Sequence, residues 1–117
     1  MAAITIYGIP NCDTTKKALA LLKKHKADFS FYDYKRQGIT KQKLDEWCDK
    51  KGWETILNKR STTWRELDEV EQKKVINQTT AIKLMMQNNS IIKRPVIEIN
   101  NNLLVGFNET DIIKQLK

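Results

Sequence analysis

The stretch ITIYGIPNCDTTKK, residues Ile4–Lys17, decides the fold, because it predicts a short β-strand that leads directly into a helix. Isoleucines alternate with other residues at its start, as in a strand, and Gly8 and Pro10 then interrupt the alternation. The acid and two threonines at residues 13–15 favour the beginning of a helix. The stretch therefore places Cys12 at the N-terminus of a helix.

A cysteine at that position has an ionisable thiol in a favourable place. Unpaired backbone N–H groups and the helix dipole stabilise an anion there, so the thiol loses its proton more easily than a free thiol of pKa ~8.5. The same N–H groups suit a bound oxyanion, which makes Asn11, Asp13 and Thr14 candidate anion-binding residues beside a nucleophilic Cys12. The alternative is that Cys12 is an ordinary small apolar residue.

Length and cysteine usage limit the class of protein. A chain of 117 residues with 40% hydrophobic residues predicts one globular domain that needs no metal or disulfide to stabilise its core. Its two cysteines, Cys12 and Cys48, lie far apart, and the N-terminus lacks the pattern of a secretory leader. No apolar run is long enough to cross a bilayer. We therefore expect a cytoplasmic protein without a membrane partner.

The net charge of +7 is compatible with a nucleic acid, an acidic protein or an anionic substrate as the partner. The lysines are spread along the chain, and no arginine-rich arm or nucleic-acid-binding motif is present. These features favour a solvated basic surface over a nucleic-acid partner.

The ends of the chain predict an α/β fold. A helix to about Lys26 and a second strand at Phe29–Asp33 complete a β-α-β unit in which the strands are parallel. Strands at Pro95–Ile99 and Leu103–Val105 predict an antiparallel hairpin around an asparagine turn, and a last helix begins near Asn108.

The block Thr40–Asn88 is predicted to be helical, without a strand. Gly52 ends its first helix, which places Cys48 on an apolar, structural stripe. Thr63 with Glu66 resembles a capping box. A later apolar face, formed by Ile82, Met85 and Met86, is predicted to pack in the core.

Two arginines at the ends of predicted elements, Arg60 and Arg94, are candidates for the chemistry of Cys12. An arginine presents a planar fork of donors that matches a carboxylate or an oxyanion, so two of them near a thiol would lower its pKa and bind an anionic substrate. The alternative for each is a surface role. The chain has one histidine, His25, so no metal site is predicted. It also has no Gly-rich phosphate loop.

Several motifs together resemble the ArsC/Spx family, most closely its YffB-type branch: residues 7–14 (YGIPNCDT), 33–34 (DY), 52–53 (GW), 58–65 (NKRSTTWR) and 91–95 (IIKRP). The likeness runs almost from end to end. It implies a thioredoxin-like fold, β-α-β then β-β-α with a mixed four-stranded sheet, as a single domain over residues 1–117 with a helical insertion at about 40–88. In that fold Pro95 is similar to a cis-proline that faces the active-site cysteine.

The resemblance also implies an activity. The arsenate reductases of the family attack arsenate with a cysteine like Cys12, hold it with arginines like Arg60 and Arg94, and complete the reduction with glutathione and glutaredoxin. Here Gly8 takes the place of a histidine, and a third arginine is replaced near Gly106 or Phe107. Each charged hydrogen bond lost weakens oxyanion binding by about 1.5–3 kcal/mol.

The Spx-like regulators of the family bind RNA polymerase and carry a Cys-x-x-Cys switch, whose second position here is Thr15. The resemblance therefore implies a glutathione-dependent thiol–disulfide oxidoreductase with Cys12 as its one nucleophile, no bound cofactor, and glutathione as co-substrate with glutaredoxin as a partner. The substrate is then a small oxyanion or a thiol or disulfide. The alternatives are an arsenate reductase and, in another class, a non-enzymatic Spx-like regulator.

Overall fold

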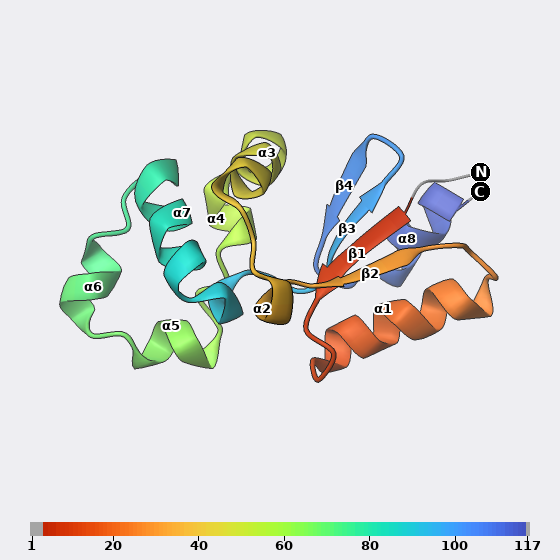
Figure 1. The fold of residues 1–117 in the computed structure, drawn as a ribbon, viewed down its shortest axis with the longest axis horizontal. Coiled ribbons are helices and arrows are strands. Elements are labelled where there is room, and N and C mark those ends of the chain that lie inside the picture. The colour runs from red at the N-terminus through yellow and green to blue at the C-terminus, as the bar shows by residue number, and fades with distance from the viewer. Residues whose placement is uncertain (1–3, 117) are drawn as a thin grey trace. The chain divides into compact units, whose positions relative to one another are not determined.

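The computed structural model describes residues 4–116, and the chain divides into two compact units (Figure 1). The sheet unit consists of the described residues up to Gln37 together with those from Arg94 onward. The helical unit is Gly38–Lys93, which contains the insertion predicted at about 40–88. The assignment of the whole chain to a single domain stays a prediction.

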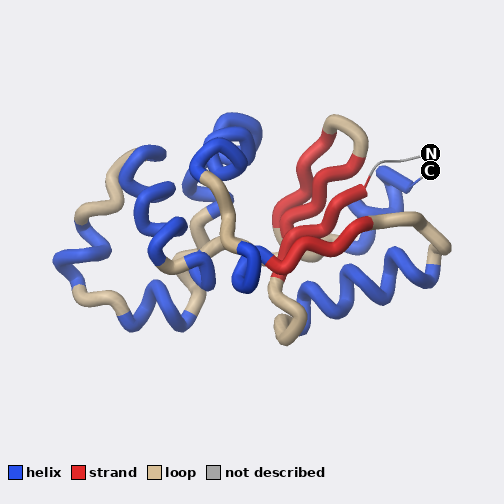
Figure 2. The backbone as a smooth tube through the Cα atoms, viewed as in Figure 1, coloured by secondary structure: helices blue, strands red, loops and turns tan. Residues whose placement is uncertain are grey.

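The sheet unit contains a mixed four-stranded sheet in the order β2-β1-β3-β4 (Figure 2). β1 and β2 are parallel, whereas β3 is antiparallel to both β1 and β4. The predicted parallel pair and the predicted hairpin are therefore confirmed. The strands are β1 (Ile4–Gly8), β2 (Ser30–Asp33), β3 (Val96–Ile99) and β4 (Asn102–Val105).

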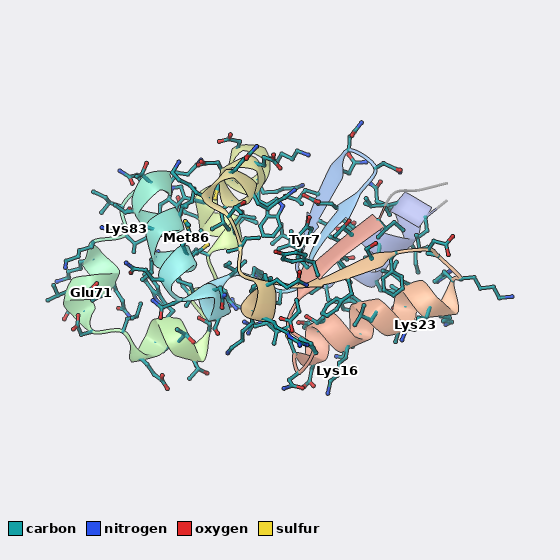
Figure 3. All side chains as sticks on the ribbon, in the orientation of Figure 1. Tyr7, Lys16, Lys23, Glu71, Lys83 and Met86 are labelled. Carbon is teal, nitrogen blue, oxygen red and sulfur yellow. The ribbon has the colours of Figure 1, made fainter. Side chains whose placement is uncertain are left out.

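Two helices, α1 (Asp13–Lys24) and α8 (Glu109–Leu116), pack on one face of this sheet. Lysines of α1 such as Lys16 and Lys23 are exposed, so the helix is amphipathic as expected (Figure 3). Burying each large aliphatic side chain contributes about 1.5–3 kcal/mol, so this layer is the main source of the unit's stability. The shared core consists of Ile4, Ile6, Ala18, Leu21, Leu22, Ile97, Ile99 and Ile112.

Two residues of the sheet unit have a left-handed backbone conformation, one just after α1 and one just after β3. Lys26 has φ 54°, and the Ala27 N–H donates to the Leu22 carbonyl, so α1 ends at Lys24 rather than at about Lys26. Asn100 has φ 55° in the turn between β3 and β4, which confirms the predicted asparagine turn.

The helical unit confirms the predicted helical block. Within the described residues of Thr40–Asn88 there is no strand, and an isolated antiparallel bridge joins Leu57 to Ile92. None of the helices described between residues 4 and 116 combines the length and apolar character needed to cross a membrane. The elements of this unit are α3 (Lys41–Lys51), α4 (Trp53–Ile56), α5 (Thr62–Glu66), α6 (Glu69–Lys73), α7 (Gln78–Gln87) and a 3₁₀ turn η1 (Asn89–Ile91).

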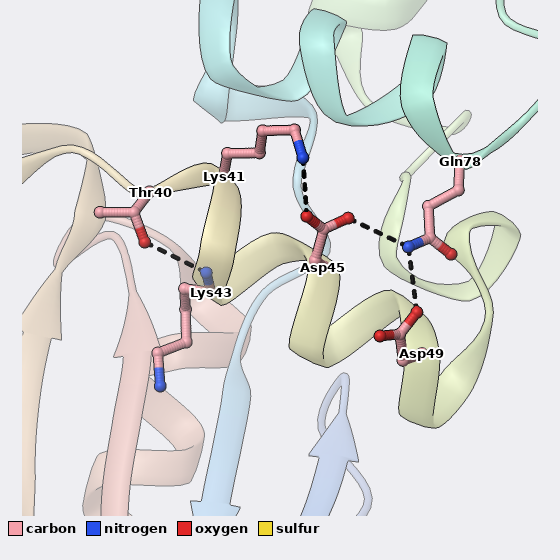
Figure 4. A network of polar contacts seen from close by, with 6 residues as sticks. All are labelled: Thr40, Lys41, Lys43, Asp45, Asp49 and Gln78. Carbon is pink, nitrogen blue, oxygen red and sulfur yellow. Dashed lines mark hydrogen bonds and ion pairs between the residues drawn. The ribbon is translucent and has the colours of Figure 1, made fainter.

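Buried side chains and one polar network hold α3 and α7 together. Leu44, Trp47 and Cys48 of α3 are buried, as is Met85 of α7. Gln78 at the start of α7 donates to both Asp45 and Asp49 of α3 at 3.1 Å, and Lys41 pairs with Asp45 at 2.9 Å (Figure 4).

Two details of the helical unit differ from the sequence-based prediction. α5 is capped by Ser61, whose hydroxyl accepts from the Trp64 N–H at 3.2 Å, and not by Thr63, because the helix already begins at Thr62. Met86 is 46% exposed, whereas Ile82 and Met85 are buried, so Met86 lies at the margin of the buried face of α7 rather than in the core as predicted (Figure 3).

Candidate functional site around Cys12

Cys12 is the N-cap residue of α1, as predicted. Its backbone is extended, its carbonyl accepts from the Lys16 N–H at 2.9 Å, and its own N–H donates to the Ile9 carbonyl at 3.0 Å. The loop is thus closed before the helix begins, and the N–H groups of the first helical turn lie beside the sulfur. This is the position on which the anion-stabilising argument depends.

The surroundings of Cys12 favour its thiolate. Partial burial acts to raise the pKa of the thiol, but hydrogen bonds from the Thr14 hydroxyl, the Thr15 backbone and the Arg94 guanidinium outweigh it, and the nearby Thr15 hydroxyl adds a smaller effect in the same direction. Together they lower the pKa of Cys12 from 9.0 to about 6. At neutral pH about nine-tenths of such a thiol is thiolate, the nucleophilic form.

The Thr14 hydroxyl has two neighbours and one proton to give. It donates to the Arg94 carbonyl oxygen at 3.1 Å, and its oxygen lies 3.0 Å from Cys12 Sγ. When Cys12 is protonated, the Thr14 hydroxyl can donate to the Arg94 carbonyl and accept from the thiol S–H. When Cys12 is a thiolate, the hydroxyl stabilises it only by donating its hydrogen to the sulfur instead of to the carbonyl. Ionisation of Cys12 therefore releases the Arg94 carbonyl as an acceptor next to the nucleophile.

Arg94 lies beside this loop, and Pro95 follows it directly before β3. The Arg94–Pro95 peptide bond is cis, as the resemblance implied. Burial acts to lower the pKa of Arg94, but its hydrogen bond to Cys12 and its interactions with Tyr34 raise it, so the guanidinium stays charged. Arg94 therefore supplies a fixed positive charge beside the thiolate.

Tyr34 is a member of the site that the sequence analysis did not select. It is fully buried in α2 (Tyr34–Gln37), where burial raises the pKa of its phenol although Arg94 acts in the opposite direction. The phenol is neutral and interacts with Arg94. Parallel pairing of Gly8 with Asp33 brings the ends of β1 and β2 to one edge of the sheet. The predicted parallel pair could therefore have pointed to Tyr34, which directly follows β2, as a neighbour of the Cys12 loop.

Thr15 is the second residue that was missed. Its side chain is fully buried, and its hydroxyl has no hydrogen-bond partner within the described residues. The hydroxyl helps to lower the pKa of Cys12 because it is placed to donate to the thiolate. A Cβ added at Gly8 would lie 2.6 Å from Thr15 Oγ1, so Thr15 occupies the space that a side chain at residue 8 would need.

The remaining predicted residues lie as follows. Asn11 and Asp13 are exposed on either side of Cys12, with Asp13 in the first turn of α1. Arg60 belongs to the helical unit and is exposed there. The roles of Asn11 and Asp13 in anion binding, and of Arg60 near Cys12, stay predictions.

Cys48 contrasts with Cys12, as expected. It is buried on α3, and burial, reinforced by the charges of Asp45 and Asp49, raises the pKa of its thiol to about 11. Among residues 4–116 no group of His, Cys, Asp and Glu side chains gathers that could hold a metal ion. The chemistry of the described site therefore centres on the thiol of Cys12.

The strand order, the cysteine at the start of the first helix and the cis-proline segment beside it define a protein of the thioredoxin-like class. Within that class, the chain belongs to the ArsC family, which it matches over residues 7–115.

Relatives of known sequence or structure agree with this assignment. The chain is 44% identical to an uncharacterized protein of Haemophilus influenzae over 92% of this chain and 94% of the relative. It is 30% identical to the global transcriptional regulator Spx of Streptococcus pyogenes, over 93% of this chain and 81% of the relative.

Two solved structures are similar over nearly the whole chain. The YffB (PA3664) protein is 43% identical with a TM-score of 0.93, covering 98% of this chain and all of the other. An arsenate reductase (ArsC) related protein from Brucella melitensis is 39% identical with a TM-score of 0.75, covering 98% of this chain and 95% of the other. The family thus includes both arsenate reductase-like and Spx-type relatives of this chain.

Proposed function

We propose that this protein is a glutathione-dependent thiol–disulfide oxidoreductase that uses Cys12 as its one nucleophile. The observation that carries the proposal is the set of donors around the sulfur, which lowers the pKa of Cys12 to about 6. A thiolate of low pKa is available at neutral pH and is also a good leaving group, so it can both form and release a mixed disulfide.

The proposed reaction has two exchange steps. The Cys12 thiolate attacks the glutathione sulfur of a mixed disulfide R–S–S–G, forms Cys12–S–S–G, and releases RS⁻, which takes up a proton. The thiolate of a second glutathione then attacks the glutathione sulfur of the adduct, forms oxidised glutathione, and releases Cys12 as thiolate. The substrate disulfide gains two electrons, and the glutathione thiols supply them.

The second step requires an external thiol. Thr15 stands three residues after Cys12, where a resolving cysteine would be, and Cys48 is buried in the core of the helical unit. During attack, Arg94 and the hydroxyls of Thr14 and Thr15 stabilise the negative charge on the Cys12 sulfur.

A turnover assay tests the proposal. The purified protein is mixed with glutathione and the glutathione mixed disulfide of 2-mercaptoethanol, and oxidised glutathione is followed by coupling to glutathione reductase and NADPH. We expect Cys12→Ser to abolish turnover and Cys48→Ser, the matched control, to retain it. Turnover that survives in Cys12→Ser would contradict the proposal.

Arsenate reduction is the second candidate, because the N–H groups of the first turn of α1 and the charged Arg94 suit an oxyanion beside the thiolate. Replacing the disulfide by arsenate, with glutathione and glutaredoxin present, tests it. An Spx-like regulator, the alternative of another class, predicts no turnover dependent on Cys12 in either assay.

A further inference from the structure

The helical unit has a pocket of about 540 Å³ that is formed by α6, by α7 and by the connection between them. Its apolar lining comes from Val75, Ile76 and Leu84. Leu84 is buried, whereas the side chain of Ile76 is 72% exposed. The pocket therefore presents apolar surface that the described residues leave open to solvent.

Two more exposed apolar side chains extend this surface on either side of the pocket. Val70 of α6 is 65% exposed, and Met86 of α7 is 46% exposed. Val70 comes four residues before Lys74, and Met86 comes three residues after Lys83, so helical spacing places each beside a residue that lines the pocket. We call the pocket together with Val70, Ile76 and Met86 the α6–α7 surface. Contiguous apolar surface of this kind is typical of a binding site for another protein.

Hydrogen bonds hold the α6–α7 surface in a fixed shape. The Ile76 N–H donates to the Thr80 hydroxyl at 3.0 Å, and Thr80 forms a capping box with Asn77 at the start of α7. The Gln72 side chain donates to the Trp64 carbonyl at 2.8 Å, which attaches α6 to α5. Because the backbone that presents Ile76 is already ordered, a partner that binds there has a smaller entropic cost to overcome.

The charges of the pocket are unequal. Glu71 pairs with Lys74 at 3.0 Å, so these two charges compensate each other. Lys83 is exposed on α7 (Figure 3), and it forms no ion pair with a carboxylate among residues 4–116. One positive charge is thus left uncompensated beside the apolar surface, in a chain whose net charge is +7. This charge complements an acidic partner, whereas a second copy of the chain would bring the same surplus.

We propose that the α6–α7 surface binds an acidic amphipathic helix of another protein. Residues 38–93 contain no strand in the structure, so this unit offers no sheet edge to an extended peptide, and a helix laid into the groove is the remaining mode. Apolar side chains of the partner pack against Ile76 and Leu84, and a carboxylate beside them pairs with Lys83. The proposal goes beyond the oxidoreductase activity, because no step involves Cys12.

The test measures the binding of two fluorescein-labelled helical peptides to the full-length protein by fluorescence anisotropy. Each peptide has about 18 residues, which is long enough to form a helix in solution, and contains no cysteine. The first carries leucines along one face and glutamates along the other. The second is identical except that lysines replace the glutamates. All titrations are made at the same ionic strength.

We expect the acidic peptide to bind saturably and the basic peptide to bind about tenfold more weakly or less. Ile76→Ser should weaken binding of the acidic peptide by about tenfold or more, because it removes a large aliphatic side chain from the contact. Lys83→Glu should weaken binding of the acidic peptide and strengthen binding of the basic one. Lys23→Glu is the matched control, since it makes the same charge change at an exposed lysine of α1, and it should leave the ratio of the two affinities near the native value.

The proposal is overturned if the acidic peptide does not saturate, or if the two peptides bind equally well. It is also overturned if Lys23→Glu changes the ratio of affinities as much as Lys83→Glu does, because net charge alone would then explain the binding. Sedimentation of the protein without peptide covers the remaining occupant: a dimer that Ile76→Ser dissociates would assign the surface to a second copy instead. Thermal unfolding checks that each variant is folded.

Discussion

Replacing Thr14 by valine should raise the pKa of Cys12, because it removes the hydroxyl that lies 3.0 Å from the sulfur but keeps the shape of the side chain. A hydrogen bond to a charged group contributes about 1.5–3 kcal/mol. Cys12 is only partly buried, so we take the lower end, which corresponds to a roughly tenfold fall in the acid dissociation constant of the thiol. At pH 6 the thiolate fraction then falls from about one half to about one tenth.

The assay is the rate of iodoacetamide alkylation of Cys12 as a function of pH, in protein that carries Cys48→Ser. We expect Thr14→Val to react about fivefold more slowly at pH 6, while above pH 9 the two rates converge because both thiols are ionised. Thr14→Ser retains the hydroxyl and should follow the native profile. The reasoning would be refuted if Thr14→Val kept the native profile, or if Thr14→Ser shifted as far as Thr14→Val.

Three further predictions concern the same loop. Gly8→Ala should destabilise the protein by about 1–3 kcal/mol in urea unfolding, because its Cβ would lie 2.6 Å from Thr15 Oγ1. Adding Thr15→Ala should recover part of that loss, and strictly additive effects of the two changes would exclude this contact as the cause. Alkylation of the native protein at pH 7 should label Cys12 and leave Cys48 unlabelled until denaturant is added; mass spectrometry of the labelled peptides decides this. Because the folded pKa of Cys12, about 6, lies below its ordinary 9.0, its stabilising contribution is complete above pH 9 and is lost as the pH falls to about 6. A Cys12→Ser protein whose unfolding free energy depends on pH in the same way as that of the native protein would rule this contribution out.

The elements of the sheet unit were predictable from local pattern. Alternating isoleucines, the Gly8 and Pro10 break, and the asparagine turn each act within a few residues, so strands, helix starts and the position of Cys12 follow from sequence alone. The N-cap position of Cys12 is a local property, and it already supplies part of the stabilisation of its thiolate.

The partners of Cys12 were decided by tertiary structure. Arg94 is 82 residues from Cys12 in the chain, and Tyr34 meets Arg94 because β1 and β2 end where the antiparallel β3 begins. The orientation of Thr15 toward the sulfur depends equally on packing, since its side chain fills the space above Gly8. Local pattern determines where a backbone turns, whereas the charges and hydroxyls that lower the pKa of a thiol act across space. Only the folded chain brings those groups together.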